Sequence, residues 1–172
     1  DEHHRLASHK FRQWEFWQGS GVPQKYIEKH WSDLDPKFDD GRHVKTWAKC
    51  RQWAEAFKLG EASASPSVVL WADGYGTSKT HTASSMVRSV LEGSTPDNLP
   101  YEVSPVHFTT ATEALMRLSA SRLWKESGGS GESEAKVYED LCGVKLLVLD
   151  DVGKERERRD QAEFYYRVIN GR

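Results

Sequence analysis

The sequence has no excess of basic residues, no long apolar run and little cysteine. It carries 24 Lys and Arg against 26 Asp and Glu, a formal net charge of −2. This balance excludes a protein that binds nucleic acid or membrane surfaces by bulk positive charge. No apolar run approaches the roughly 20 residues that span a bilayer. Cys50 and Cys142 lack the spacing of a zinc or redox motif, so we expect a cytoplasmic protein with reduced cysteines and no membrane partner.

The sequence has enough apolar mass for one packed core. Hydrophobic residues make up 37% of the 172 positions, with seven Trp, six Tyr and six Phe. Small polar residues form two expected loops, 60–66 and 127–133. The first loop separates a helical N-terminal segment, residues 1–60, from residues 61–172. In the N-terminal segment, apolar side chains spaced by three and four residues between Val44 and Phe57 predict a helix whose tryptophans face the core.

After residue 60 the expected strands alternate with expected helices. The runs 67–71 and 144–149 are compact and apolar, which is typical of strands. The run 103–109 is a further strand candidate, in which Pro105 suits only an edge strand or the start of a strand. Helical spacing predicts helices over 79–92, from 111, around 137–141 and from 161. This alternation predicts an α/β fold, in which a parallel sheet is covered by helices on both faces. Ligands of such sheets bind at the carboxyl ends of the strands.

A phosphate-binding sequence follows the first expected strand directly. Residues 73–80 read DGYGTSKT, close to the P-loop pattern G-x-x-x-x-G-K-[ST]. In that pattern a glycine-rich turn cradles phosphates, a lysine reaches the β- and γ-phosphates, and a hydroxyl binds Mg²⁺. Lys79 and Thr80 supply the lysine and the hydroxyl of this pattern. Asp73 and Ser78 replace the two glycines of the pattern, which favours weak or unusual nucleotide handling.

A second motif lies about 70 residues further along the chain. Residues 146–151 read LLVLDD, an apolar strand that ends in two carboxylates. In P-loop ATPases the first acid after such a strand helps to hold Mg²⁺, and the second orients the attacking water. Each motif alone is also compatible with a plain turn. Together, and in this order, they indicate nucleotide binding.

Roughly residues 20 to 172 resemble the DnaC/IstB family of AAA+ ATPases. The resemblance rests on WADGYGTSKTHTA at 71–83, on FTT at 108–110 with EAL at 113–115, on KLLVLDDVGKE at 145–155 and on YRVINGR at 166–172. The segment GSGVPQKYIEKHWSDL at 19–34 is also similar to the family. The most specific piece is the pattern Asp-Asp-x-Gly-x-Glu, formed by Asp150, Asp151, Gly153 and Glu155.

The resemblance implies an ATPase that binds ATP with Mg²⁺ and hydrolyses it to ADP and phosphate. Lys79 and Asp151 would be catalytic, with Asp151 orienting the hydrolytic water. Thr80 and Asp150 would share the metal. The nucleotide would be bound by Gly74, Tyr75, Gly76, Thr77, Ser78, Lys79, Thr80 and His81.

The family also implies a fold and partners. The expected fold is a P-loop NTPase of the AAA+ type, with residues 61–172 as the front portion of the ATPase domain and its sensor and arginine-finger region absent. The expected function is that of a bacterial or phage-encoded helicase loader, which oligomerises with ATP and binds a replicative helicase and single-stranded DNA. The alternatives are a transposition helper, with a transposase as its partner, and an adaptor with a degenerate P-loop and little hydrolysis.

Two groups of side chains are candidates for these contacts. Arg117, Arg122 and Lys125 lie where the loader family inserts helices that bind DNA. Trp14 and Trp17, in a basic N-terminal helix, are candidates for docking on a helicase, provided that both are exposed.

Overall fold

The structure is a computed structural model that describes residues 2–59, 66–74, 76–100, 102–126, 131–153 and 161–172. It divides into two compact units, Asp1–Pro105 and Val106–Arg172. The division expected from the sequence, into an N-terminal segment 1–60 and a domain portion 61–172, stays a prediction. None of the described helices is both long and apolar enough to cross a membrane.

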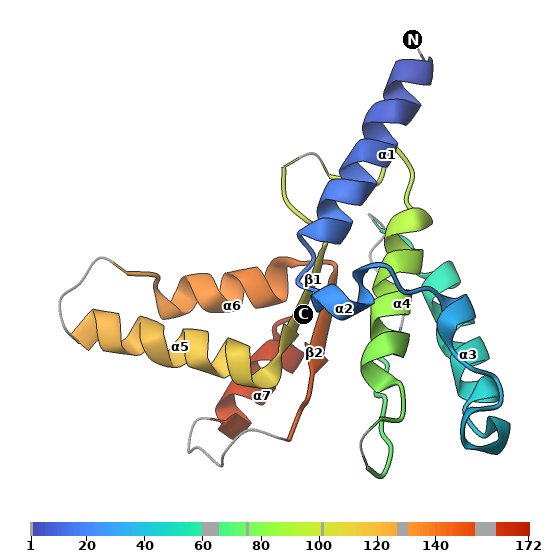
Figure 1. Cartoon of the computed structure of the whole chain (residues 1–172). Helices are drawn as coiled ribbons and strands as arrows, with labels where there is room; N and C mark the ends of the chain where they lie inside the picture. Colours follow the sequence, from blue (N-terminus) through green and yellow to red (C-terminus); the bar gives the residue numbers. More distant parts are fainter. Residues whose placement is uncertain (1, 60–65, 75, 101, 127–130, 154–160) are drawn as a thin grey trace. The chain divides into compact units, whose positions relative to one another are not determined.

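The regular structure described in the first unit is helical (Figure 1). Its elements are α1 (Glu2–Gln18), α2 (Gln24–Ile27), the 3-10 turns η1 (Trp31–Asp33) and η2 (Phe38–Gly41), α3 (Val44–Ala56) and α4 (Lys79–Glu92). The helix expected over 79–92 is therefore confirmed with its bounds. Helix α4 contacts α1, α2 and α3, and Figure 1 shows it lying alongside α3.

Helix α4 is buried on nearly all sides. Seven consecutive residues, 81–87, are buried, and seven residues make about two full turns of a helix. Helix α1 satisfies backbone groups at the C-terminal end of α4, where the last carbonyls have no partner within the helix. The Gln13 Nε2 donates to the Leu91 carbonyl at 2.8 Å and to the Ser94 Oγ at 3.1 Å.

The expected tryptophan stripe forms the inner face of α3. Trp47, Cys50 and Ala54 are buried, as is Phe57 directly after the helix, while Val44 at its start is 41% exposed. Trp53 is partly buried, and its Nε1 donates to the Pro66 carbonyl at 2.9 Å. The expected role of this stripe in the core is therefore confirmed for most of its members.

The second unit pairs two strands beside three helices. Strands β1 and β2 are parallel, with Val106 opposite Leu146 and Thr110 opposite Asp150. The alternate residues Leu147 and Leu149 pack on the core between the helices. The elements are β1 (Val106–Thr110), α5 (Ala111–Glu126), α6 (Glu134–Gly143), β2 (Leu146–Asp150) and α7 (Gln161–Asn170). The core comprises Ala114, Leu115, Leu118, Val137, Leu141, Phe164 and Val168.

The expected AAA+ sheet sandwiched by helices is wrong. The described residues form seven α-helices and only two short parallel strands, so the protein is a small helical one. Residues 66–70 have no regular secondary structure, and Val69 and Trp71 are 86% and 78% exposed. The run 67–71 has strand propensity, but a strand also needs a neighbour for its backbone hydrogen bonds. No described strand pairs with it.

The strand expected over 144–149 forms, but it is shallower than the sequence predicts. Strand β2 covers Leu146–Asp150, and each of its residues is only partly buried. A continuous apolar run is typical of a strand covered on both faces in a wide sheet. With β1 as its one described neighbour, β2 buries mainly the alternate side chains that face the helices. The strand expected over 103–109 begins after Pro105, because proline cannot donate to a ladder.

A reciprocal capping box begins helix α5. The Glu113 N–H donates to the Thr110 Oγ1 at 3.1 Å, and the Thr110 N–H donates to the Glu113 Oε2 at 3.0 Å. This is the pattern Thr-x-x-Glu of a helix N-terminus. The bonds from the Thr110 N–H and hydroxyl hold the pKa of Glu113 below its usual value. The glutamate therefore stabilises the fold above its usual pKa, and this contribution is lost as the pH falls through the lowered value.

We predict that Thr110→Ala lowers the free energy of unfolding by about 1 kcal/mol at neutral pH, because it removes the side-chain acceptor at the cap. Urea denaturation of the full chain measures this change. Thr112→Ala is the matched control, since Thr112 is exposed in the same turn and outside this box. Equal effects of the two substitutions would contradict the role of the capping box.

Candidate functional site

The loop before α4 has the backbone of an anion-binding turn. Gly74 and Gly76 have φ of +86° and +76°, which the absence of a Cβ makes accessible. Ser78, which stands where the P-loop pattern has its second glycine, also lies in the left-handed region, at φ 60° and ψ 18°. A left-handed residue followed by a right-handed helical one turns successive N–H groups to one side. The loop therefore keeps a glycine-like backbone at position 78 despite the substitution.

The Lys79 side chain folds back over this loop. Its Nζ donates to the Gly74 carbonyl at 3.2 Å and to the Thr77 Oγ1 at 2.8 Å. A Cβ built on Gly74 or Gly76 would meet no described atom within 4 Å. The Lys79 ammonium group therefore lies close to the backbone of the loop, with open space beside both glycines.

The helix start adds to this positive field. An α-helix begins with N–H groups that have no carbonyl partner within the helix, and its dipole is equivalent to about half a positive charge there. The Ser78 side chain makes no capping hydrogen bond, while its carbonyl accepts from the Thr82 N–H and Oγ1, both at 2.8 Å. Lys79 and Thr80 are partly buried at this end, and Asp73 is exposed two residues before Tyr75. Tyr75 itself lies outside the described residues.

His81 faces a different partner. Its Nε2 lies 3.0 Å from the His30 carbonyl, and its ring packs against that of Tyr26 at 5.7 Å between centroids. The contact joins α4 to the segment 24–33. Residue spacing gives no signal for this contact, because the partners lie about 50 positions apart.

In the second unit, the two carboxylates lie at the carboxyl end of β2. Asp150 is the last residue of the strand, and Asp151 has φ 56°. Gly153 follows with φ 87°, so the chain turns sharply after the acids. Both carboxylates are partly buried. Glu155, the last residue of the family pattern, lies outside the described residues.

The oxygen atoms that the resemblance assigns to the metal suit magnesium. Hydroxyl and carboxylate oxygens such as those of Thr80 and Asp150 are the ligands that Mg²⁺ takes, together with waters and substrate phosphates. Within the described ranges, no group of three or more His, Cys, Asp or Glu side chains could hold a metal ion. Thr80 and Asp150 belong to different units, and each is described within its own.

The arginines expected to contact DNA make ion pairs within the second unit. Arg117 pairs with Glu132 and Asp140, and the bond with Glu132 raises the pKa of the arginine. Arg122 pairs with Glu134 at 3.1 Å. These pairs link α5 to α6 and to the residues just before it, so DNA binding would have to compete with them. Lys125 is exposed near the end of α5.

Only one of the two N-terminal tryptophans is exposed. Trp17 is 7% exposed, and its Nε1 donates to the Ile27 carbonyl at 3.0 Å. Trp14 is 57% exposed and stacks on Phe11 at 6.0 Å between ring centroids. Trp17 therefore belongs to the core of the first unit, and the exposed pair that docking required is not present.

No protein-family model, curated protein or solved structure matches this chain.

We predict that Ser78→Gly raises the free energy of unfolding by about 1 kcal/mol, because glycine adopts the left-handed backbone without the steric cost that serine carries. Chemical denaturation of the full chain measures the change. Ser84→Gly is the control, because Ser84 lies in the right-handed interior of α4, where glycine has a low helix propensity and also removes the bond from the buried Ser84 hydroxyl to the Thr80 carbonyl, so that stability falls by about 1 kcal/mol or more. If Ser78→Gly destabilises the chain as Ser84→Gly does, the loop does not have this backbone.

Proposed function

We propose that this protein binds Mg-ATP through the loop at 74–80 and acts as an ATP-dependent helicase loader. The observation that carries the proposal is the Lys79 ammonium group, held over a loop with positive φ at Gly74, Gly76 and Ser78. Triphosphate oxygens would replace the Gly74 carbonyl and the Thr77 hydroxyl as acceptors for Lys79. Backbone N–H groups and the helix dipole would add to the binding.

The carboxylates of the second unit would serve hydrolysis. The proposal assigns Asp150, with the Thr80 hydroxyl, to Mg²⁺ and Asp151 to the orientation of the attacking water. Bound Mg²⁺ would neutralise charge that develops on the phosphates. The turn after β2 supports these roles, because it ends the strand with two adjacent acids.

The partners in this proposal come from the DnaC/IstB resemblance. They are a replicative helicase and single-stranded DNA, with ATP-dependent self-association of the chain. The transposition helper is the alternative with the same chemistry. A replicative helicase recovered with the protein from its host would support the first branch, and a transposase would support the second.

A second candidate function is that of an adaptor with a degenerate P-loop, which binds nucleotide weakly or not at all and hydrolyses little. Two departures from the P-loop pattern favour it. The Ser78 side chain occupies a position where backbone normally approaches phosphate closely, and Asp73 adds an exposed negative charge near the loop. Binding and hydrolysis therefore need separate measurements.

We predict that the full chain binds Mg-ATP in calorimetry and that Lys79→Ala abolishes the binding, because the substitution removes the positive charge over the loop. Lys49→Ala is the matched control, since Lys49 is exposed on α3 of the same unit and should leave binding unchanged. Absence of binding by the unmutated protein would refute the ATPase.

We predict that Asp151→Asn lowers ATP turnover about a hundredfold or more in the presence of single-stranded DNA, because an amide cannot act as a base toward water. ATP affinity should remain, since Asp151 is not assigned to the triphosphate. Phosphate release and calorimetry measure the two quantities. Glu139→Gln, on the exposed surface of α6, is the control for a lost carboxylate. Binding without turnover by the unmutated protein would favour the adaptor.

A further inference from the structure

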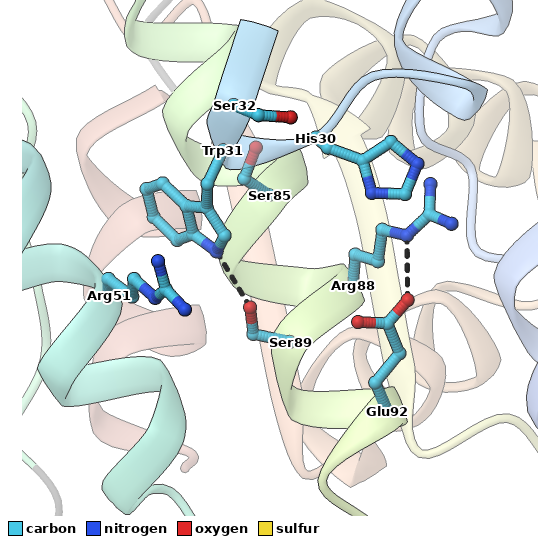
Figure 2. Close-up of a pocket in the computed structure, with 8 residues that line it drawn as sticks. All are labelled: His30, Trp31, Ser32, Arg51, Ser85, Arg88, Ser89 and Glu92. Atoms are coloured by element: carbon cyan, nitrogen blue, oxygen red, sulfur yellow. Dashed lines mark hydrogen bonds and ion pairs between the residues drawn. The ribbon is translucent and has the colours of Figure 1, made fainter. Parts of the chain in front are cut away.

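The first unit contains a pocket on the side of α4, beyond the proposed nucleotide loop. Its volume is about 230 Å³. Its wall is formed by the segment that begins at His30, by one side chain of α3 and by one stripe of α4 (Figure 2). The residues that matter here are Trp31, Arg51, Ser85, Arg88, Ser89 and Glu92.

Ser85 brings a buried hydroxyl without a partner to this pocket. It is 1% exposed, and its Oγ has no hydrogen-bond partner among the described residues. Two neighbouring buried side chains of α4 behave differently. The Thr82 Oγ1 donates to the Ser78 carbonyl and the Ser84 Oγ to the Thr80 carbonyl, both at 2.8 Å. Buried hydroxyls are almost always paired, so the Ser85 hydroxyl indicates a partner from within the pocket.

The arginines of the lining offer hydrogen-bond donors to an anion. The guanidinium groups of Arg51 and Arg88 and the carboxylate of Glu92 line the pocket, and each arginine is paired with a carboxylate of its own helix. The Arg88 side chain is held in place, because its Nε donates to the Glu92 Oε1 at 2.8 Å and its Nη1 to the Ile27 carbonyl at 3.3 Å. The Arg51 Nε donates to the Glu55 Oε1 at 2.8 Å. A guanidinium carries five N–H donors in a planar fork, so these bonds occupy only part of each arginine.

Trp31 gives the pocket a rigid apolar wall. Its indole Nε1 donates to the Ser89 Oγ at 2.8 Å, which fixes the ring against α4. Figure 2 shows Arg51 reaching from α3 toward this ring, with Arg88 and Glu92 together on the other side. The volume lies below the roughly 300–1,000 Å³ of sites for drug-sized ligands. The pocket therefore fits a small ligand.

We propose that this pocket binds a small oxyanion, a carboxylate or a phosphate, whose oxygens accept from Arg51, Arg88 and the Ser85 hydroxyl, with its apolar part against Trp31. A planar guanidinium fork matches the geometry of both anions. The site differs from the nucleotide loop, because Ser85 lies five residues beyond Thr80 on α4. The proposal therefore does not depend on ATP binding.

The experiment titrates the full-length Lys79→Ala variant with inorganic phosphate and, separately, with succinate. The readout is the NMR signal of the Trp31 indole N–H, assigned with Trp31→Phe. Lys79→Ala removes the charge of the nucleotide loop, so that phosphate binding there does not enter the result. Saturable shifts at millimolar concentration with either probe support the site. A shift of the Trp31 signal with phosphate alone would identify a phosphate ligand, and a shift with succinate alone would identify a carboxylate.

Two variants test the assigned donors in the same background. Arg51→Gln should weaken binding about tenfold, whereas Arg42→Gln, an exposed arginine elsewhere in the unit, should leave it unchanged. Ser85→Ala should weaken binding severalfold without lowering the denaturation midpoint, because it removes a buried hydroxyl that has no protein partner. A merely structural serine would lower the midpoint instead.

The proposal is overturned by three results. The first is the absence of a Trp31 shift with both probes, and the second is equal affinity in Arg51→Gln and Arg42→Gln. The third is a Ser85→Ala variant that binds normally and is less stable. If the unmutated protein does not bind ATP, the proposal for this pocket is unaffected. The pocket and the nucleotide loop are therefore tested by separate results.

Discussion

The burial of α4 is the constraint on which the first unit depends. Two full turns of this helix, residues 81–87, are buried, so it cannot divide into one apolar and one solvated face. Its polar side chains must find partners inside the unit. Thr82 and Ser84 use carbonyls of the preceding turn, and His81 meets the His30 carbonyl. The last contact ties the N-terminal segment to α4 close to the point where the loop at 74–78 enters it.

The two ends of α4 have different hydrogen-bond partners. At the C-terminal end, Gln13 of α1 donates to the Leu91 carbonyl, which gives a carbonyl of the last turn a partner within the protein. At the N-terminal end, Ser78 makes no side-chain cap and the chain enters in a left-handed conformation. Lys79 then places an ammonium group over the loop. The N-terminal end is therefore the one suited to an external anion.

Sequence patterns predicted local structure well and the sheet poorly, for one physical reason. Helix α4 satisfies its own backbone, so the periodicity over 79–92 and the break at Gly93 were enough to define it. The run 67–71 has the composition of a strand, but strand formation depends on a neighbour that local composition does not specify. The capping box of Thr110 and Glu113 lies within four residues, and for that reason it can be read from the sequence.

The candidate sites also differ in how far the sequence could predict them. Lys79 and Thr80 could be proposed from the sequence because a phosphate-loop pattern is contiguous, whereas the left-handed backbone of Ser78 could not be predicted, since serine has no preference for it. The oxyanion pocket was missed because it joins three segments that lie far apart in the chain. Its one local signal is the polar stripe Ser85, Arg88, Ser89 and Glu92, spaced by three and four residues on a helix whose remaining surface is largely buried.

The choice of serine at position 85 is the strongest argument that this stripe has a function. Alanine has the higher helix propensity and would leave no buried hydroxyl without a partner. Ser84, the preceding residue, gains a hydrogen bond from its hydroxyl, and Ser85 gains none from any described residue. Stability alone would therefore favour alanine at position 85. A ligand that accepts a hydrogen bond from this hydroxyl, beside the two arginines, explains why position 85 is a serine.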